Sequence, residues 1–185
     1  MILSIYGYGF PVLKQKAKAI DKDYPDFNTL LENMWETMYN SDGVGLAAPQ
    51  VGISIRLFLV DSVQMMKEGE EDMGVKQAFI NAEILEEGGG SWEYEEGCLS
   101  IPDVRGDVTR ERQIKIKYLD ENFEEHTKVF TGVNARVIQH EYDHIEGKLF
   151  IEMLKPIRKR RVKRRLEKIK KGDVDVGYKM KFYSR

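Results

Sequence analysis

The stretch His140-Glu141-Tyr142-Asp143-His144 places two histidines four residues apart, with a glutamate beside the first. On a helix, residues at i and i+4 lie on one face, so both imidazoles would point at the same place. Such a pair is suited to one metal ion, and Glu141 would then reach a water on that ion. The interpretation as a metal site therefore depends on a helix at this point of the chain.

Apolar residues around the two histidines recur at helical spacing, at Val133, Val137, Ile138, Tyr142 and Ile145. Gly147 follows as a C-terminal stop, and we predict a helix from about residue 132 to residue 146. The alternative is a buried helix on which two histidines lie four apart by chance. A catalytic zinc-like site needs a third protein ligand and an open fourth position, so another part of the chain must supply the third ligand.

The bulk properties fit a globular protein with one buried core. The chain has 185 residues, of which 42% are hydrophobic, and we expect a single domain over 1–185. The only cysteine excludes a disulfide within the chain and fits a reducing compartment. The first residues lack the pattern of a secretory signal, and no stretch approaches the length of a membrane span. We therefore expect a cytoplasmic protein without membrane contact.

The first half of the chain predicts an arm, a helix and a loop. Residues 1–25 are expected to be extended, because Gly7, Gly9 and Pro11 interrupt regular structure. A helix over 26–40, capped by Asp26, is predicted from one apolar stripe, formed by Phe27, Leu30, Leu31, Met34, Trp35 and Met38. The loop that follows, Gly43 to Gln50, is either a small-residue turn or a place of close backbone approach.

The second half predicts short strands. They are expected at 54–61, 77–81, 82–87, 113–119 and 123–130, with an exposed acidic insertion at 64–74. The glycines at 88–90 are expected to loosen the chain. The pattern favours an α+β fold, in which antiparallel sheets pack around the helix that carries His-Glu-x-x-His. An N-terminal helix and a basic C-terminal helix at about 155–171 complete this architecture.

Cys98 is the candidate third ligand. A lone cysteine is most often a buried structural thiol. Here it follows Gly97, which allows close backbone approach, and it is the only thiol in a chain that needs one more soft ligand. Cys98 together with His140 and His144 would form a Cys-His-His site.

Three separated stretches resemble the signature motifs of the peptide deformylase family. They are Gly43-Val44-Gly45-Leu46-Ala47-Ala48-Pro49-Gln50, Glu96-Gly97-Cys98-Leu99-Ser100 and Gln139-His140-Glu141-Tyr142-Asp143-His144. The resemblance implies an α+β domain that wraps three antiparallel sheets around the motif helix. This chain departs from the family pattern in a longer segment at 64–76, and in Tyr142, where the family often has Leu or Met.

The resemblance also implies an activity, which is removal of the formyl group from N-formyl-methionine at the start of new polypeptides. It implies that Cys98, His140 and His144 hold one divalent metal ion. Fe²⁺ is expected in the cell, with Zn²⁺, Ni²⁺ or Co²⁺ as replacements. Glu141 would first accept the proton of the attacking water and then protonate the leaving amine. The Gln50 amide and the backbone N–H of Leu99 would stabilise the oxyanion.

Substrate contacts are predicted from motif position. Gly45 and Gly97 would let the peptide backbone pair beside the metal ion. The methionine side chain needs an apolar pocket, which we expect to be lined by Val44, Tyr94, Leu99, Ile138 and Ala135. Asp143 is expected to form a structural salt bridge with Arg110.

The run from Lys155 to Lys171 contains eleven Lys and Arg residues and one acid, Glu167. The remaining residues hold 18 bases and 30 acids, a net charge of −12. Most such runs are solvated helix faces. The alternative is contact with a polyanion, and for an enzyme that acts on emerging chains that polyanion would be ribosomal RNA.

Two other functional classes are consistent with parts of the sequence. Zinc peptidases also use His-Glu-x-x-His, but a cysteine ligand is unusual there and the other two motifs would be unexplained. A ribosome- or RNA-binding factor without enzymatic activity would explain only the basic run. Release of formate from a formyl-methionyl tripeptide distinguishes all three classes.

Overall fold

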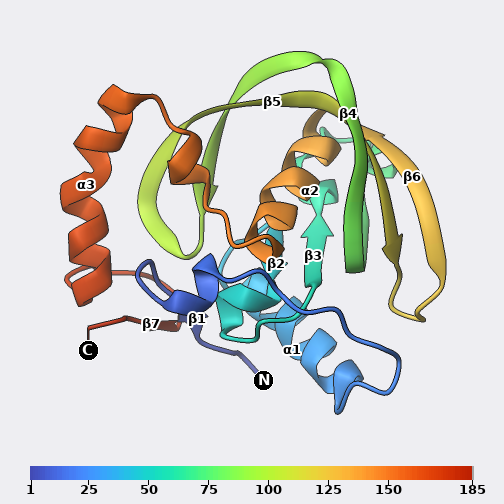
Figure 1. Ribbon diagram of the computed structural model, residues 1–185, viewed down its shortest axis with the longest axis horizontal. Coiled ribbons are helices and arrows are strands. Elements are labelled where there is room, and N and C mark those ends of the chain that lie inside the picture. The colour runs from blue at the N-terminus through green and yellow to red at the C-terminus, as the bar shows by residue number, and fades with distance from the viewer. Residues whose placement is uncertain (185) are drawn as a thin grey trace.

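The computed structural model describes residues 1–184 and has an α+β architecture (Figure 1). Three α-helices are present in this range: α1 (Phe27–Asn40), α2 (Gly132–Ile145) and α3 (Pro156–Lys171). The strands are β1 (Ile5–Tyr6), β2 (Gly45–Ala47), β3 (Leu57–Asp61), β4 (Lys76–Cys98), β5 (Ile101–Leu119), β6 (Glu125–Thr131) and β7 (Met180–Lys181). The three predicted helices are confirmed to within two residues at each end.

The strands form one antiparallel sheet and one small parallel pair. The antiparallel sheet has five strands in the order β2-β3-β4-β5-β6, and β1 pairs with β7 in parallel. The expectation of three antiparallel sheets was therefore wrong for the described residues. The reason is the length of β4 and β5, which stay paired from Ile80 and Leu119 to Cys98 and Ile101 and arch over α2 (Figure 1).

The prediction of separate strands at 77–81 and 82–87, ended by glycines at 88–90, was also wrong. These residues all belong to β4, and the pairing with β5 continues on both sides of a register shift between Gly88 and Ser91. Gly89 and Gly90 have φ values of +80° and +82°, which glycine adopts at no steric cost. The glycines therefore form a β-bulge that bends the strand without ending it.

The sheet is buried on both faces at β3. Phe58 and Val60 pack toward α2, whereas Leu57 and Leu59 pack in the cluster that contains the apolar stripe of α1. This is why β3 reads as an uninterrupted apolar run in the sequence. Helix α2 therefore covers one face of β3, and α1 covers the other.

Helix α2 begins and ends as the sequence predicts. Gly147 follows the helix with φ +72°, and Glu146 is its C-cap. Asp26 does stand at the N-cap of α1, but its side chain forms no capping hydrogen bond, so that part of the prediction was wrong.

Helix α3 packs on a third core cluster through Val162, Leu166 and Ile169. None of the helices in residues 1–184 is both long and apolar enough to cross a membrane.

Candidate metal centre

Three potential ligand atoms meet where α2 faces the end of β4. α2 carries His140 and His144 one turn apart, and Cys98 is the last residue of β4. Ligand atoms of the three side chains lie within 4.8 Å of one another, and Cys98 Sγ is 3.4 Å from His144 Nε2. The two motifs that the sequence left 42 positions apart therefore converge on one point.

This arrangement fits a divalent transition metal. Metal–sulfur and metal–nitrogen bonds of ~2.3 Å and ~2.1 Å place the ligands of a tetrahedral ion about 3.5 Å apart. The sulfur–nitrogen distance of 3.4 Å matches that spacing. One thiolate and two imidazoles are also a donor set that such metals favour.

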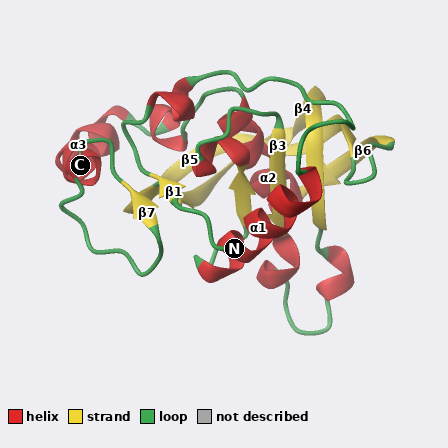
Figure 2. Ribbon diagram, turned by 90° about the horizontal axis from the view of Figure 1, so that it is seen from below, coloured by secondary structure: helices red, strands yellow, loops and turns green. Residues whose placement is uncertain are grey.

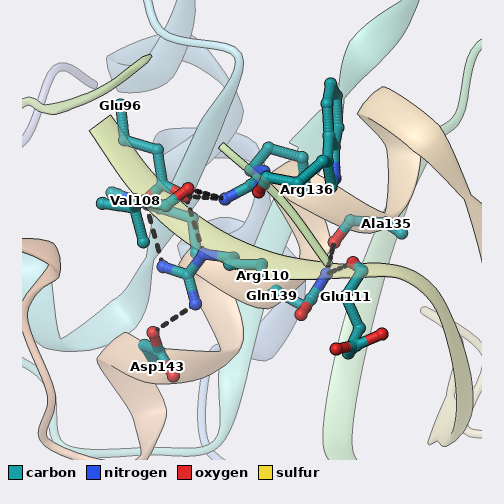
Figure 3. Close-up of polar contacts among 10 residues, drawn as sticks. Glu96, Val108, Arg110, Glu111, Ala135, Arg136, Gln139 and Asp143 are labelled. Atoms are coloured by element: carbon teal, nitrogen blue, oxygen red, sulfur yellow. Dashed lines mark hydrogen bonds and ion pairs between the residues drawn. The ribbon is translucent and has the colours of Figure 1, made fainter. Parts of the chain in front are cut away.

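Glu96 orients the first histidine. Its Oε2 accepts a hydrogen bond from His140 Nδ1 at 2.8 Å, which leaves Nε2 of that ring for a metal ion. The carboxylate also accepts from Arg110 Nε at 2.6 Å and from Arg136 Nη1 at 3.0 Å. Arg110 in turn donates to Asp143 at 2.7 Å (Figure 3), which confirms the predicted Asp143–Arg110 salt bridge.

The electrostatics of the two histidines differ. Burial holds the pKa of His144 well below 6.5, so this ring is neutral, as a metal ligand must be. Burial acts in the same direction on His140, but hydrogen bonds with Cys98 and Glu96 outweigh it and raise the pKa of His140 well above 6.5. A metal ion that binds here would displace the proton that His140 holds beside Cys98 and Glu96.

Glu141 is buried next to the ligands. Burial raises the pKa of its carboxyl group to about 7, and Oε2 has no hydrogen-bond partner among the described residues. Gly45 of β2 packs directly against Glu141, since a Cβ atom added at position 45 would lie 2.7 Å from Glu141 Cδ. Glycine at position 45 is therefore needed because any side chain would displace the carboxylate.

The side-chain amide of Gln50 is a neighbour of the Cys98 sulfur. Its Oε1 accepts a hydrogen bond from the backbone N–H of Ala47 at 2.9 Å, which turns the NH₂ group toward the ligands. That NH₂ group is 3.4 Å from Cys98 Sγ and 3.3 Å from Ser100 Oγ. Gln50 is 2% exposed, so its orientation is fixed by the fold.

An open cleft of about 530 Å³ lies beside the three ligands. Five residues that were proposed from the sequence as substrate contacts line this cleft: Val44, Gly45, Tyr94, Gly97 and Leu99. Ala135 and Ile138 do not, because both are fully buried in the core between α2 and the sheet. Arg136 and Val137 face the cleft from α2 in their place, so the prediction had the correct helix but the wrong residues.

Sequence reasoning also missed several residues at the site. Glu96 and Arg136 are charged yet almost fully buried, at 5% and 2% exposed. Arg136 lies one helical turn before His140, a spacing that could have indicated it. Met65, from the start of the acidic insertion, and Tyr178, near the C-terminus, line the cleft without any signal in the local sequence.

The chain matches the polypeptide deformylase family model over residues 2–160. The chain belongs to the peptide deformylase family. A peptide deformylase of Christiangramia forsetii is 53% identical over 98% of this chain and 96% of its own length. One of Flavobacterium johnsoniae is 49% identical over the same shares.

Solved deformylase structures have the same fold. The crystal structure of a peptide deformylase from Legionella pneumophila superposes with a TM-score of 0.81 at 35% identity, covering 94% of this chain and 98% of that one. The enzyme from Thermotoga maritima gives a TM-score of 0.75 at 42% identity, covering 84% and 99%. This deformylase is thus a metallohydrolase that removes the N-terminal formyl group from nascent peptides.

Proposed function

We propose that the deformylase binds one divalent metal ion through Cys98, His140 and His144 and uses Glu141 as its general base. The observation that supports this most directly is the convergence of the three ligand atoms within 4.8 Å beside a buried carboxylate. When bound, the metal lowers the pKa of a water molecule and polarises the formyl carbonyl.

Glu141 handles the proton. Its carboxylate accepts the proton of the attacking water and then delivers it to the departing amine nitrogen of the methionine. A pKa of about 7 suits both halves of this role, since the group gains and loses a proton near neutral pH. The free Oε2 supports this assignment because it has capacity to bond to a water molecule.

Gln50 and Leu99 are assigned to the oxyanion. Negative charge that develops on the formyl oxygen is stabilised by donors that are already in place. The Gln50 NH₂ group points toward the ligands, and Leu99 follows Cys98 at the edge of the cleft. The N–H of Leu99 is thus the second proposed donor.

The substrate peptide is proposed to lie along the cleft between β2 and the end of β4. Gly45 and Gly97 would offer their backbones to it, as glycines allow a close approach. The methionine side chain would contact the apolar atoms of Val44, Leu99 and Val137, with Tyr94 at the rim. We place this reaction in the cytoplasm, where nascent chains are made.

Replacement of Glu141 by Gln tests the general base. The variant should keep its metal content and lose several decades of kcat for formate release from N-formyl-Met-Ala-Ser, because ligation is intact and proton transfer is lost. Glu95→Gln, a change in an exposed acid on the same cleft, serves as the matched control. A Glu141→Gln enzyme with a tenth of the normal kcat would contradict the assignment.

We propose Fe²⁺ as the metal in the cell, with Zn²⁺, Ni²⁺ and Co²⁺ as replacements. Attack on the formyl group is favoured by an ion that accepts a fifth ligand. Zn²⁺ bound by a thiolate accepts it less readily than Fe²⁺, Ni²⁺ or Co²⁺. Zinc nevertheless binds such a site more tightly than iron, so a purified sample is expected to carry zinc.

The second proposal concerns α3 and ribosomal RNA. Arg165 and Lys168 pair with Asp103 and Asp173, so part of the basic charge is locally neutralised. Six exposed cations form no ion pair within residues 1–184; they are Lys159, Arg160, Arg161, Lys163, Arg164 and Lys171. This one-sided charge supports contact with a polyanion at the place where nascent chains emerge.

Charge reversal tests this contact. Arg160, Arg161 and Arg164 changed together to Glu should weaken ribosome binding and reduce its salt-dependence slope by about 2 to 3, with unchanged kcat on a tripeptide. The matched control reverses three exposed lysines outside α3, namely Lys22, Lys67 and Lys128. Equal ribosome binding by both variants at every salt concentration would make α3 a solvated helix face.

A further inference from the structure

The segment Asp175–Tyr178 returns from the end of α3 to the catalytic cleft. All four of its residues line the cleft that contains the metal ligands. The family match ends at residue 160, so this wall of the cleft lies outside the matched region.

The segment is held in place by the pairing of β7 with β1 (Figures 1 and 2). The backbone N–H of Ile5 donates to the carbonyl of Lys179 at 2.9 Å, and that of Gly7 donates to the carbonyl of Lys181 at 2.9 Å. Met180 packs against the apolar cluster under α3. The residues just before β7 are therefore fixed relative to the cleft.

Tyr178 connects this segment to the backbone beside the metal ligand. Its hydroxyl donates a hydrogen bond to the carbonyl oxygen of Leu99 at 2.7 Å. The neighbouring residues are held from other directions, since Gln50 donates to Cys98 Sγ and the N–H of Tyr8 donates to the carbonyl of Ser100 at 2.8 Å. Each residue of 98–100 is thus fixed by a different part of the chain.

We propose that Tyr178 is a positioning residue for deformylation, which orients the Leu99 backbone so that its N–H faces the developing oxyanion. This inference rests on the proposed role of Leu99. The N–H and the carbonyl of Leu99 flank one Cα atom, so anchoring the carbonyl restricts the rotation that would turn the N–H away. An oxyanion donor contributes most when it is oriented before the reaction begins.

The test is Tyr178→Phe, which removes the hydroxyl and keeps the ring. Loss of one anchoring hydrogen bond should lower kcat for N-formyl-Met-Ala-Ser about threefold to tenfold. KM, affinity for the product Met-Ala-Ser and metal content should stay at wild-type values, because only the transition state uses the oriented N–H. The melting temperature should fall by at most about 6 °C, as expected from the loss of one hydrogen bond. Tyr183→Phe is the control. Tyr183 lies five residues after Tyr178, contacts Phe10 and does not line the cleft.

A kcat of Tyr178→Phe within twofold of the wild type overturns the inference. A fall in kcat accompanied by loss of metal, or by a fall in melting temperature of more than about 6 °C, also overturns it, since the hydroxyl would then be structural. If the Phe variant does not fold, Tyr178→Met tests loss of the hydroxyl together with the ring, with the same kcat and KM readouts. Glu141→Gln is assayed in parallel: its inactivity shows that the proposed chemistry stands even if Tyr178 has no part in it.

Discussion

Replacement of Glu96 by Gln is expected to damage both stability and metal binding. The carboxylate is 5% exposed and accepts four hydrogen bonds, two from Arg110 and one each from Arg136 and His140. Burial acts against the ionised form, but His140 and Arg110 outweigh it and hold the pKa of Glu96 well below 4.5. Glutamine keeps the shape but removes the charge, and its NH₂ group would face another donor.

The magnitude follows from these contacts. Removal of one partner from a buried ion pair costs about 3–5 kcal/mol, because the opposite charge stays buried and unpaired. In a domain of this size each kcal/mol shifts the melting temperature by roughly 2–4 °C, so a decrease of about 6–20 °C is expected. Loss of the hydrogen bond that orients a ligating histidine lowers metal affinity about 10- to 100-fold.

Two assays on one preparation test this prediction. Calorimetry of the metal-free protein gives the melting temperature, and competition with a chelator gives the zinc affinity. Glu93→Gln is the control, since Glu93 lies on the same strand and pairs with Lys155, but at the surface, and it should leave both quantities unchanged. A Glu96→Gln protein with wild-type melting temperature and zinc affinity would show that this carboxylate neither stabilises the fold nor orients His140 for a metal ion.

Three further predictions concern Gly45, Glu146 and the metal ion. Gly45→Ala should lower kcat about 100-fold at unchanged metal content, because the new methyl group displaces the Glu141 carboxylate; an active Ala variant would contradict this. Burial opposes ionisation of Glu146, but Arg56 outweighs it and lowers its pKa. Wild-type protein should therefore have a higher melting temperature than Glu146→Gln above about pH 4.5, and this difference should disappear as pH falls. Thermal unfolding of both metal-free proteins between pH 3 and 7 measures it. Ferrous or nickel enzyme should exceed zinc enzyme in kcat, and the ferrous form should lose activity in air as Cys98 oxidises; a zinc enzyme equal to an air-stable ferrous enzyme would overturn this.

The helices were predictable because their signals are local. The apolar stripe of α1, the glycine after α2 and the basic run of α3 each lie within a few turns of sequence. The long strands were not predictable in the same way, because the glycines at 88–90 are typical of loops, and only the partner strand β5 determines that they form a bulge.

The cluster of Cys98, His140 and His144 was predictable because the two histidines lie one helical turn apart, and because the chain has a single cysteine. The pocket was less predictable. Ile138 and Val137 are adjacent on α2, and which of them faces the cleft depends on a rotation that the sheet sets. Tyr178 reaches Leu99 from 79 residues away, a contact that arises from tertiary structure alone.

Release of formate is proposed to need one metal ion bound by Cys98, His140 and His144. The most direct measurement strips the metal, titrates Fe²⁺ back without oxygen and follows formate from N-formyl-Met-Ala-Ser. Metal-free enzyme is expected to release no formate, and activity is expected to rise linearly to a maximum at one ion per chain. Cys98→Ser should bind the ion weakly and remain inactive at that ratio. Full activity without metal, or in Cys98→Ser at one ion per chain, would show that formate release does not depend on this metal site.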